Sequence, residues 1–287
     1  MCIRDRHLLQ LIWNQRKQNA WLWAELLLVS VFLWFLVDYL YVMGRTYTAP
    51  LGFDIRHTYS IVISSLSERS PDYIPKEKRE RPDGVHLLTA LDRIRTYPGV
   101  ESACLTDGGM PYYMGSRNLV WRIDTLQVPC RYAFVTPEFF DVFRIYDKDG
   151  KTASLKRAIE DNNSIVISAD VETMNPGLSL LGQKAYRGNV TDEIEETIRG
   201  ISVPIRRHEY TKAEPNVYRA LRLSRMEEGY YEGMIDAVRL CVRVRPDVDN
   251  ADFPARFRKD MAEQLRLGNL YPVSYTHLRA HETPEHL

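Results

Sequence analysis

The longest mostly apolar run of the chain, Trp21 to Val42, limits the fold more than any other feature. Within it, Leu26 to Val37 carry no charge, and Ser30 is their one polar residue. A core helix of a globular protein would more often show polar residues at every third or fourth position. At about 1.5 Å per residue the run spans roughly 33 Å, enough for a hydrocarbon core of about 30 Å. The sequence therefore predicts a transmembrane helix over residues 21–43, with a buried helix of a soluble domain as the alternative.

Two acidic residues, Glu25 and Asp38, flank the apolar centre. Each lies about 10 Å from the middle of the span, near the headgroups, where a charge costs well below its mid-bilayer maximum. The acids either pair with basic residues on partner helices or reach water at the headgroups. Aromatic residues typical of a membrane interface stand at both ends of the span: Trp21, Trp23, Tyr39 and Tyr41.

The charges on either side of the predicted span indicate its orientation. Arg16 and Lys17 precede it in a segment without acidic residues, whereas the basic residues after it are mixed with Asp54. The positive-inside rule then places residues 7–20, a predicted amphipathic segment, in the cytoplasm.

This orientation puts everything after about residue 44 outside the cytoplasm. We therefore expect a protein of the cell inner membrane, in contact with membrane lipid, whose main domain at residues 44–272 is periplasmic. The alternative is a cleaved signal peptide, because the apolar run also has the length of a signal-peptide core and Val42–Gly44 is an acceptable cleavage site.

The two ends of the chain differ from the rest. Residues 1–6, MCIRDR, and residues 273–287, VSYTHLRAHETPEHL, resemble translated sequencing adapters. We expect neither end to belong to the natural protein and the chain to be a fragment cut at both ends. His277, His281 and His286 in the second segment are therefore excluded as candidate metal ligands, although two of them are four residues apart, as helical ligand pairs are.

The middle of the chain contains two similar β-α-β patterns, Thr58–Leu105 and Val238–Val273. Each places an amphipathic helix after an alternating strand and before another strand. Between them, short strands predominate, and residues 137–215 are expected to form an inserted, mostly β subdomain. The pattern predicts an α+β fold: one N-terminal transmembrane helix, then an extracytoplasmic domain of two β-α-β halves with that insertion.

Two of these segments have a specific predicted environment. Val238–Val244, VRLCVRV, alternates apolar and basic residues, which predicts an edge strand or one that is half exposed. Asp192–Glu196 is acidic and is expected to form a loop.

Motifs that would indicate catalysis or metal binding are incomplete. Gly177–Lys184 is similar to a phosphate-binding loop but lacks the Gly-Lys-Ser/Thr ending. Asp147–Gly150 begins like a calcium loop without the later glutamate, so we expect a turn. His57, His86 and His208 stand singly and are interpreted as surface or hydrogen-bonded histidines. The sequence thus predicts that the protein is not an enzyme. We expect no catalytic, cofactor-binding or metal-binding residues, and no bound cofactor.

The net charge limits the kinds of partner that we expect, and the cysteine spacing bears on possible disulfides. The chain has 38 basic and 38 acidic residues, and a net charge of zero does not favour a nucleic-acid partner. Its four cysteines, Cys2, Cys104, Cys130 and Cys241, form no Cys-x-x-Cys pair. In an oxidising periplasm two of them could pair, but the spacing does not say which, and buried thiols are the favoured interpretation.

The segment YAFVTPEFFDVFRI, Tyr132–Ile145, resembles the Val-Ser/Thr-Pro-x-Phe-Phe stretch in the extracytoplasmic core domain of MacB/FtsX-like ABC-transporter permeases. Further similar segments follow the family's order, although Gln183 follows Gly182 where the family has lysine. The start of the chain is similar to the first span of such permeases from Bacteroidetes-like bacteria. The resembling segments besides the first are Ile12–Tyr41, Ser164–Tyr186, Ile198–Tyr218 and Val238–Tyr271.

The resemblance implies an architecture and a set of partners. Such permeases have four transmembrane helices, with the large outer domain between the first and second, so this chain would hold helix one and most of that domain. They act as dimers with ATPase subunits, and ATP-driven closure moves the outer domains, a process called mechanotransmission. The resemblance thus implies a separate ABC ATPase, a homodimer or a paired permease, and in exporters a periplasmic adaptor.

Two other classes of protein agree with parts of the sequence. A single-span sensor or ligand-binding protein would have the same anchor and outer domain but no further spans. A membrane-anchored enzyme would need a pocket in which titratable residues converge.

Overall fold

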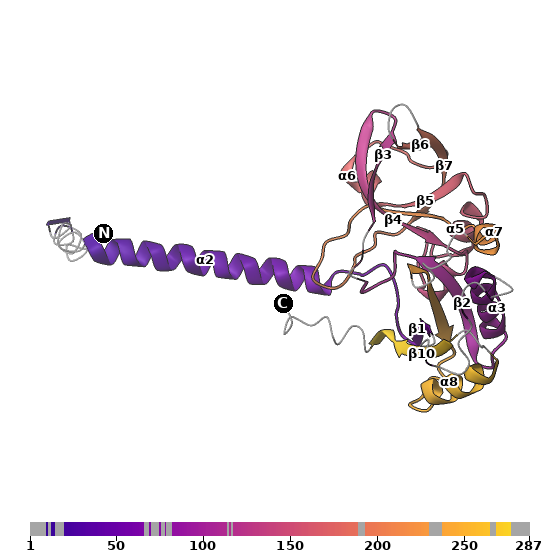
Figure 1. The fold of residues 1–287 in the computed structure, drawn as a ribbon. Coiled ribbons are helices and arrows are strands. Elements are labelled where there is room, and N and C mark those ends of the chain that lie inside the picture. The colour runs from indigo at the N-terminus through magenta and orange to yellow at the C-terminus, as the bar shows by residue number, and fades with distance from the viewer. Residues whose placement is uncertain are drawn as a thin grey trace. The chain divides into compact units, whose positions relative to one another are not determined.

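The structure is a computed structural model, and it describes residues 10, 13–14, 20–65, 69, 75, 78, 82–113, 115, 117–188, 193–229, 237–264 and 268–276 (Figure 1). The chain forms two compact units, Met1–Pro50 and Leu51–Leu287. The predicted adapter segment at residues 1–6, most of the amphipathic segment at 7–20 and the C-terminal residues 277–287 lie outside the described residues.

The first unit contains helix α2, Ala20–Thr48, whose 29 residues correspond to about 44 Å of helix. None of its residues is buried, and its leucine, valine, phenylalanine and tryptophan side chains are exposed all round. Among the described residues, it is the one helix long and apolar enough to cross a membrane. The predicted N-terminal apolar helix is thus confirmed, and it contains residues 21–43.

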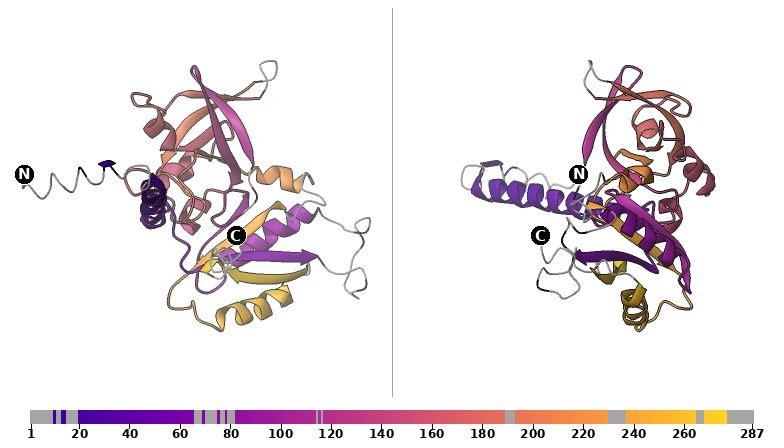
Figure 2. Two further views of the ribbon diagram at one scale, coloured as in Figure 1. Left: turned by 90° about the vertical axis from the view of Figure 1, so that its left-hand side faces the viewer. Right: turned by 45° about the vertical axis from the view of Figure 1, so that its right-hand side comes forward.

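The second unit begins and ends with a four-stranded antiparallel layer in the order β10-β1-β9-β2. Each β-α-β unit has its two strands separated by a strand of the other unit, so the units interlock. The two predicted β-α-β halves are confirmed, and both views of Figure 2 place β1 beside β10. The elements are β1 Thr58–Ser65, α3 Asp83–Arg95, β2 Val100–Asp107, β9 Arg239–Val244, α8 Phe253–Gln264 and β10 Gly268–Ser274.

Successive residues of these strands serve two separate cores, because side chains of a strand alternate between its faces. Leu105 and Leu240 pack with helices α3 and α8 on one face. Cys104 and Cys241 pack on the other face, with the aromatic residues that follow β4. The layer is therefore covered on both sides.

The prediction for Val238–Val244 was wrong in one respect, since β9 is a central strand and five of its six residues are buried. Its alternation reflects two covered faces and not one exposed face. Arg243, which reads as a solvent-facing residue in the sequence, is 1% exposed.

Between the two β-α-β units, six strands form a closed ring. They pair in the order β4-β3-β6-β7-β5-β8, and β8 then pairs in parallel with β4 (Figure 1). The ring extends from residue 118 to residue 220, beyond the predicted insertion at 137–215. The first three residues of β7 fall in the expected acidic loop, Asp192–Glu196. The strands are β3 Asn118–Ile123, β4 Leu126–Val135, β5 Ser164–Ser168, β6 Lys184–Arg187, β7 Ile194–Ser202 and β8 Asn216–Ala220.

Strand β4 belongs to both parts, because its last residues also pair with β2. Helix α4 follows it, and the aromatic side chains Phe139, Phe140 and Phe143 are fully buried against the layer and Tyr218 of β8. This core joins the layer to the ring. The short helices are α4 Phe139–Val142, α5 Ala153–Ala158, α6 Asp170–Met174 and α7 Leu223–Glu227.

Candidate functional site: the clamped entry segment

Residues 51–57, here called the entry segment, connect helix α2 to strand β1 along the chain. One buried arginine of β9 holds this segment. Arg243 donates from Nη1 to the main-chain oxygen of Arg56 (2.7 Å) and from Nη2 to that of Asp54. Its Nε donates to the main-chain oxygen of Val142 at the end of α4 (2.7 Å). The guanidinium thus joins the entry segment, the central strand and the aromatic helix.

Arginine suits this position because its planar guanidinium carries five N–H donors in a fixed arrangement. Burial lowers the pKa of Arg243, as does the nearby Arg144, while the carboxylate of Asp54 opposes that shift. The side chain nevertheless stays cationic, because arginine titrates far above neutral pH. A buried cation held by three main-chain oxygens is costly to remove, since those oxygens would lose their donors.

Asp54 is fixed by the entry segment itself. Its carboxylate accepts the main-chain N–H of Arg56 (2.8 Å) and the guanidinium Nη2 of the same residue (2.8 Å). Burial raises the pKa of Asp54. The hydrogen bonds from Arg56 and the charge of Arg243 together lower this pKa by more than burial raises it, so the net shift is downward. The main-chain N–H of Asp54 donates to the oxygen of Phe143 (2.8 Å).

The end of the entry segment is held by Asp249, in the turn between β9 and α8. His57 has a left-handed backbone, with φ of 58°. Its Nδ1 lies 2.5 Å from one carboxylate oxygen of Asp249, and the hydroxyl of Tyr59 donates to the other. Burial raises the pKa of Tyr59, and Asp249 adds to the shift. His57 is therefore a paired histidine at a junction, and the structure assigns it no base or ligand role.

The start of the entry segment is attached to the ring. Gly52 has φ of 84°, and a Cβ placed on it would lie 2.1 Å from the main-chain oxygen of Pro204. The oxygen of Leu51 accepts the N–H of Arg206 (3.0 Å) in the loop between β7 and β8. The entry segment therefore contacts both parts of the domain: the ring at its start and the layer at its end.

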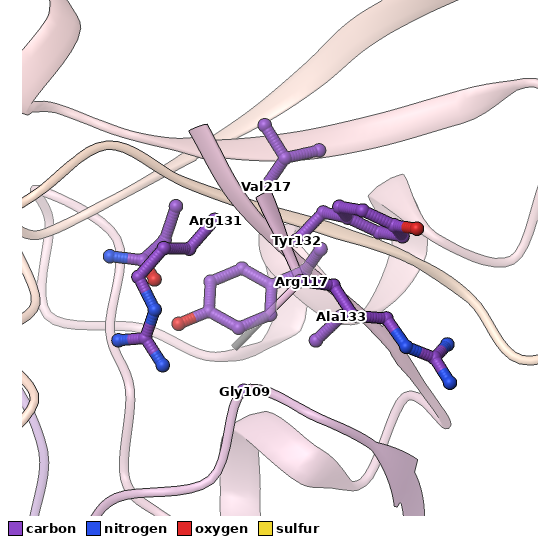
Figure 3. A pocket seen from close by; sticks show the side chains of 8 residues that line it. Gly109, Arg117, Arg131, Tyr132, Ala133 and Val217 are labelled. Atoms are coloured by element: carbon purple, nitrogen blue, oxygen red, sulfur yellow. The ribbon is translucent and has the colours of Figure 1, made fainter. Parts of the chain in front are cut away.

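A second candidate site is a small hollow beside β4 and β8 (Figure 3). Its volume of about 10 Å³ has room for about one water molecule, whereas ligand pockets measure several hundred cubic ångströms. The guanidinium groups of Arg117 and Arg131 point away from each other. The buried Tyr218 hydroxyl has no hydrogen-bond partner in the described part of the chain, and burial raises its pKa. The hollow does not have the size of a substrate site.

The other candidate residues of the sequence, Asp147, His86 and His208, lie on separate elements of the fold. The carboxylate of Asp147 accepts the N–H groups of Asp149 (2.9 Å) and Lys151 (2.8 Å), which closes a turn. His86 lies on α3 and His208 in the loop before β8. Over the described residues, no three His, Cys, Asp or Glu side chains gather where they could hold a metal ion.

Sequence reasoning missed Gly52 of the entry segment and the two residues that hold this segment, Arg243 and Asp249. Arg243 gave no signal of burial, because the alternation of apolar and basic residues around it indicates an exposed face. The buried carboxylate of Glu196 inside the ring was also missed, since it stands in an acidic run.

Comparison with solved structures identifies the fold of the second unit. A domain of a protein described as a permease, from Porphyromonas gingivalis, superimposes with a TM-score of 0.50 at 16% identity, covering 77% of this chain and 92% of that domain. That likeness shows a shared fold. No protein-family model matches the chain, and no curated protein matches it in sequence.

Two further solved structures are similar to this chain with TM-scores below 0.5. The extracellular domain of the noncanonic ABC-type transporter YknZ from Gram-positive bacteria has a TM-score of 0.45 at 12% identity, covering 75% of this chain and 99% of that one. The periplasmic region of MacB from Actinobacillus actinomycetemcomitans has a TM-score of 0.47 at 10% identity, covering 83% and 98%.

Proposed function

We propose that this chain is the first membrane span and the outer domain of a permease subunit of an ABC transporter. The subunit relays ATP-driven motion from a separate ATPase, across the cell inner membrane, to a domain in the periplasm. The observation that carries this proposal is the fold of the chain, 77% of which superimposes on 92% of a domain from a protein described as a permease. An apolar helix of membrane-spanning length stands directly before that domain in the sequence.

The entry segment supports a mechanical role. A relay needs the chain that leaves the membrane to be fixed to the domain that it moves. Here Arg243, Asp249 and the main-chain N–H of Arg206 hold the seven residues after the first unit at several points. Motion of the entry segment would pass to the four-stranded layer through Arg243 and to the ring through the loop at Arg206.

No active site is part of the proposal. The hollow beside β4 is too small for a substrate, and a relay works by rigid coupling without a nucleophile or general base. The partners that we propose are the ATPase, a second permease copy or paired permease, a periplasmic adaptor and membrane lipid. The ATPase would meet the basic segment at residues 7–20 on the cytoplasmic side.

The experiment uses the complete gene and the ATPase gene beside it, with both subunits purified together in lipid nanodiscs. The proposal predicts that the two co-purify and that ATP hydrolysis changes the distance between spin labels on the outer domains of two permease copies. Arg243→Met should reduce this change while ATP is still hydrolysed, and Arg245→Met, at an exposed residue directly after the same strand, should leave it intact. Failure of any ATPase subunit to associate with the wild-type chain would refute the proposal.

A single-span sensor is the second candidate, because its anchor and outer domain would have the same form. A ligand that raises the thermal stability of the purified chain, in a protein with no ATPase partner, would favour the sensor.

A further inference from the structure

Cys104 of β2 and Cys241 of β9 face each other directly. They are register partners in the antiparallel pairing of these two strands. Directly opposite residues of such a pair point to the same face of the sheet, and both thiols lie in the aromatic core beside α4. Both thiols are free in the structure, and both side chains are fully buried.

The main chain around Cys104 determines the spacing of the pair. The N–H of Leu105 donates to the Thr136 hydroxyl (3.1 Å), and its oxygen accepts the N–H of Thr136 (3.0 Å). The main-chain N–H and C=O of Leu105 thus point away from β9. Because these groups alternate in direction along a strand, those of Cys104 point toward β9. Cys104 and Cys241 form a hydrogen-bonded pair, with Cα atoms about 5.5 Å apart. Disulfides typically have Cα separations of about 4.4–6.8 Å and Cβ separations of about 3.5–4.5 Å. The Cα separation of this pair lies within the first range. Its Cβ atoms, about 5.5 Å apart in a hydrogen-bonded pair, must approach by about 1 Å when the bond closes.

We propose that Cys104 and Cys241 form a cross-strand disulfide in the periplasmic protein. The inference rests on the proposed function, because disulfides persist outside the cytoplasm and the proposed topology places the domain there. It selects one pairing among those that the spacing of the cysteines in the sequence left open. Cys130 lies in the separate core inside the ring, with its thiol 3.5 Å from the main-chain oxygen of Val128.

The bond lies at the base of the ring. Strand β2 leads into the ring and β9 returns from it, so a link between Cys104 and Cys241 closes a loop of chain that contains all six ring strands. In a domain that transmits motion, this bond would keep β2 and β9 in register when the ring is displaced. It lies two residues along β9 from Arg243, so the two connections would act at the same strand.

The bond forms while the strands pair, before the thiols are enclosed. Burial raises the pKa of Cys104, and the neighbouring Cys241 raises it further, so little of folded Cys104 is present as the reactive thiolate. During folding, one thiolate attacks a protein disulfide of the cell envelope and forms a mixed disulfide. The second thiolate then attacks that sulfur and releases the oxidant as a dithiol. Two cysteine thiols lose two protons and two electrons, and one oxidant disulfide becomes two thiols.

The test expresses the full chain in bacteria with an oxidising periplasm and blocks free thiols with N-ethylmaleimide at cell lysis. Digestion under non-reducing conditions, followed by mass spectrometry, should find the peptides of Cys104 and Cys241 linked. The mass of the linked product should lie two hydrogen atoms below the summed masses of the two free peptides. Reduction before blocking should abolish the link. Cys104→Ser should abolish it as well, whereas Cys130→Ser should leave the yield of linked peptide unchanged.

A phosphatase fused to the C-terminus reports topology independently in the same cells. If the phosphatase is active and both cysteines are nevertheless blocked by maleimide, the disulfide is refuted and the proposed function stands. If the phosphatase is inactive, the proposed topology fails, and the pairing is judged on the chain refolded with oxidised glutathione. Linkage of Cys104 to Cys241 would then support the geometry, and linkage through Cys130 would overturn it.

Discussion

Arg243 donates a hydrogen bond from Nε to the main-chain oxygen of Val142 over 2.7 Å, although the two residues are 101 positions apart. The same guanidinium reaches two oxygens of the entry segment. A single side chain of the central strand therefore fixes where the chain enters the domain and where the aromatic helix ends. The following predictions concern this junction and the ring beyond it.

Replacing Arg243 with methionine should lower the free energy of unfolding by about 3 kcal/mol, because three main-chain oxygens lose their donor. The main-chain N–H of Asp54, now bonded to Phe143, should also exchange with solvent faster. Urea unfolding and hydrogen exchange measure the two effects. Arg245→Met is the control, since Arg245 is exposed and its guanidinium pairs with the exposed Asp247, and it should change stability by less than about 0.5 kcal/mol. Equal losses in both variants would contradict the role of Arg243.

Gly52→Ala should displace the start of the entry segment. The new Cβ would lie 2.1 Å from the oxygen of Pro204, and the backbone is left-handed there. We expect a loss of about 3 kcal/mol, the sum of a backbone cost of about 1 kcal/mol and a larger cost of overpacking. Thermal unfolding of the chain in detergent measures it.

Gly150→Ala separates these two costs. Gly150 has a similar φ of 75°, but nothing lies within 4 Å of its Cβ position. The control should lose only the backbone cost of about 1 kcal/mol. A loss at position 52 no larger than at position 150 would show that the contact with Pro204 gives way without cost.

Glu196→Gln should destabilise the ring by about 3 kcal/mol, because it leaves the buried guanidinium of Arg219 without its counter-charge. Glu196 is 1% exposed, its Oε1 accepts Nε of Arg219 (2.6 Å), and the indole of Trp121 donates to Oε2 (3.3 Å). Glu195→Gln is the matched control, since Glu195 is half exposed and pairs with Lys184. That variant should lose far less stability, because water screens its ion pair. Chemical denaturation of the two variants side by side measures the difference.

Asp54 should make the domain sensitive to acid. The pKa of Asp54 is lower in the folded chain than its ordinary value of 3.8, so the unfolded chain takes up the proton first. Its contribution to stability is complete above that value and is lost as the pH falls through the folded pKa. Asp54→Asn should therefore show a shallower loss of stability between about pH 5 and pH 2. The exposed Asp92→Asn should keep the wild-type slope, and identical slopes for Asp54→Asn and the wild type would refute the assignment.

Local patterns in the sequence were enough to predict both β-α-β units. The alternation in Thr58–Leu66 and the spacing of Leu87, Leu91 and Ile94 depend only on which face of each element is buried.

Long-range pairing was beyond what local patterns could predict. The closure of the ring depends on the parallel pairing of β4 with β8, which are some 80 residues apart in the chain. Arg243 and Glu196 were read as solvent-facing because charge normally indicates exposure, yet both are buried with hydrogen-bond partners. Pairings of this kind become visible only when the strands that bring the partners together are known.

The most direct test of the permease function is a long-read sequence of the native gene locus through both ends of this chain. The permease account predicts that the reading frame continues past the predicted adapter junction near Pro272 into three further apolar spans, beside a gene for an ATPase with Walker motifs. A stop codon directly after the domain, with no ATPase gene nearby, would contradict the account and favour a single-span sensor.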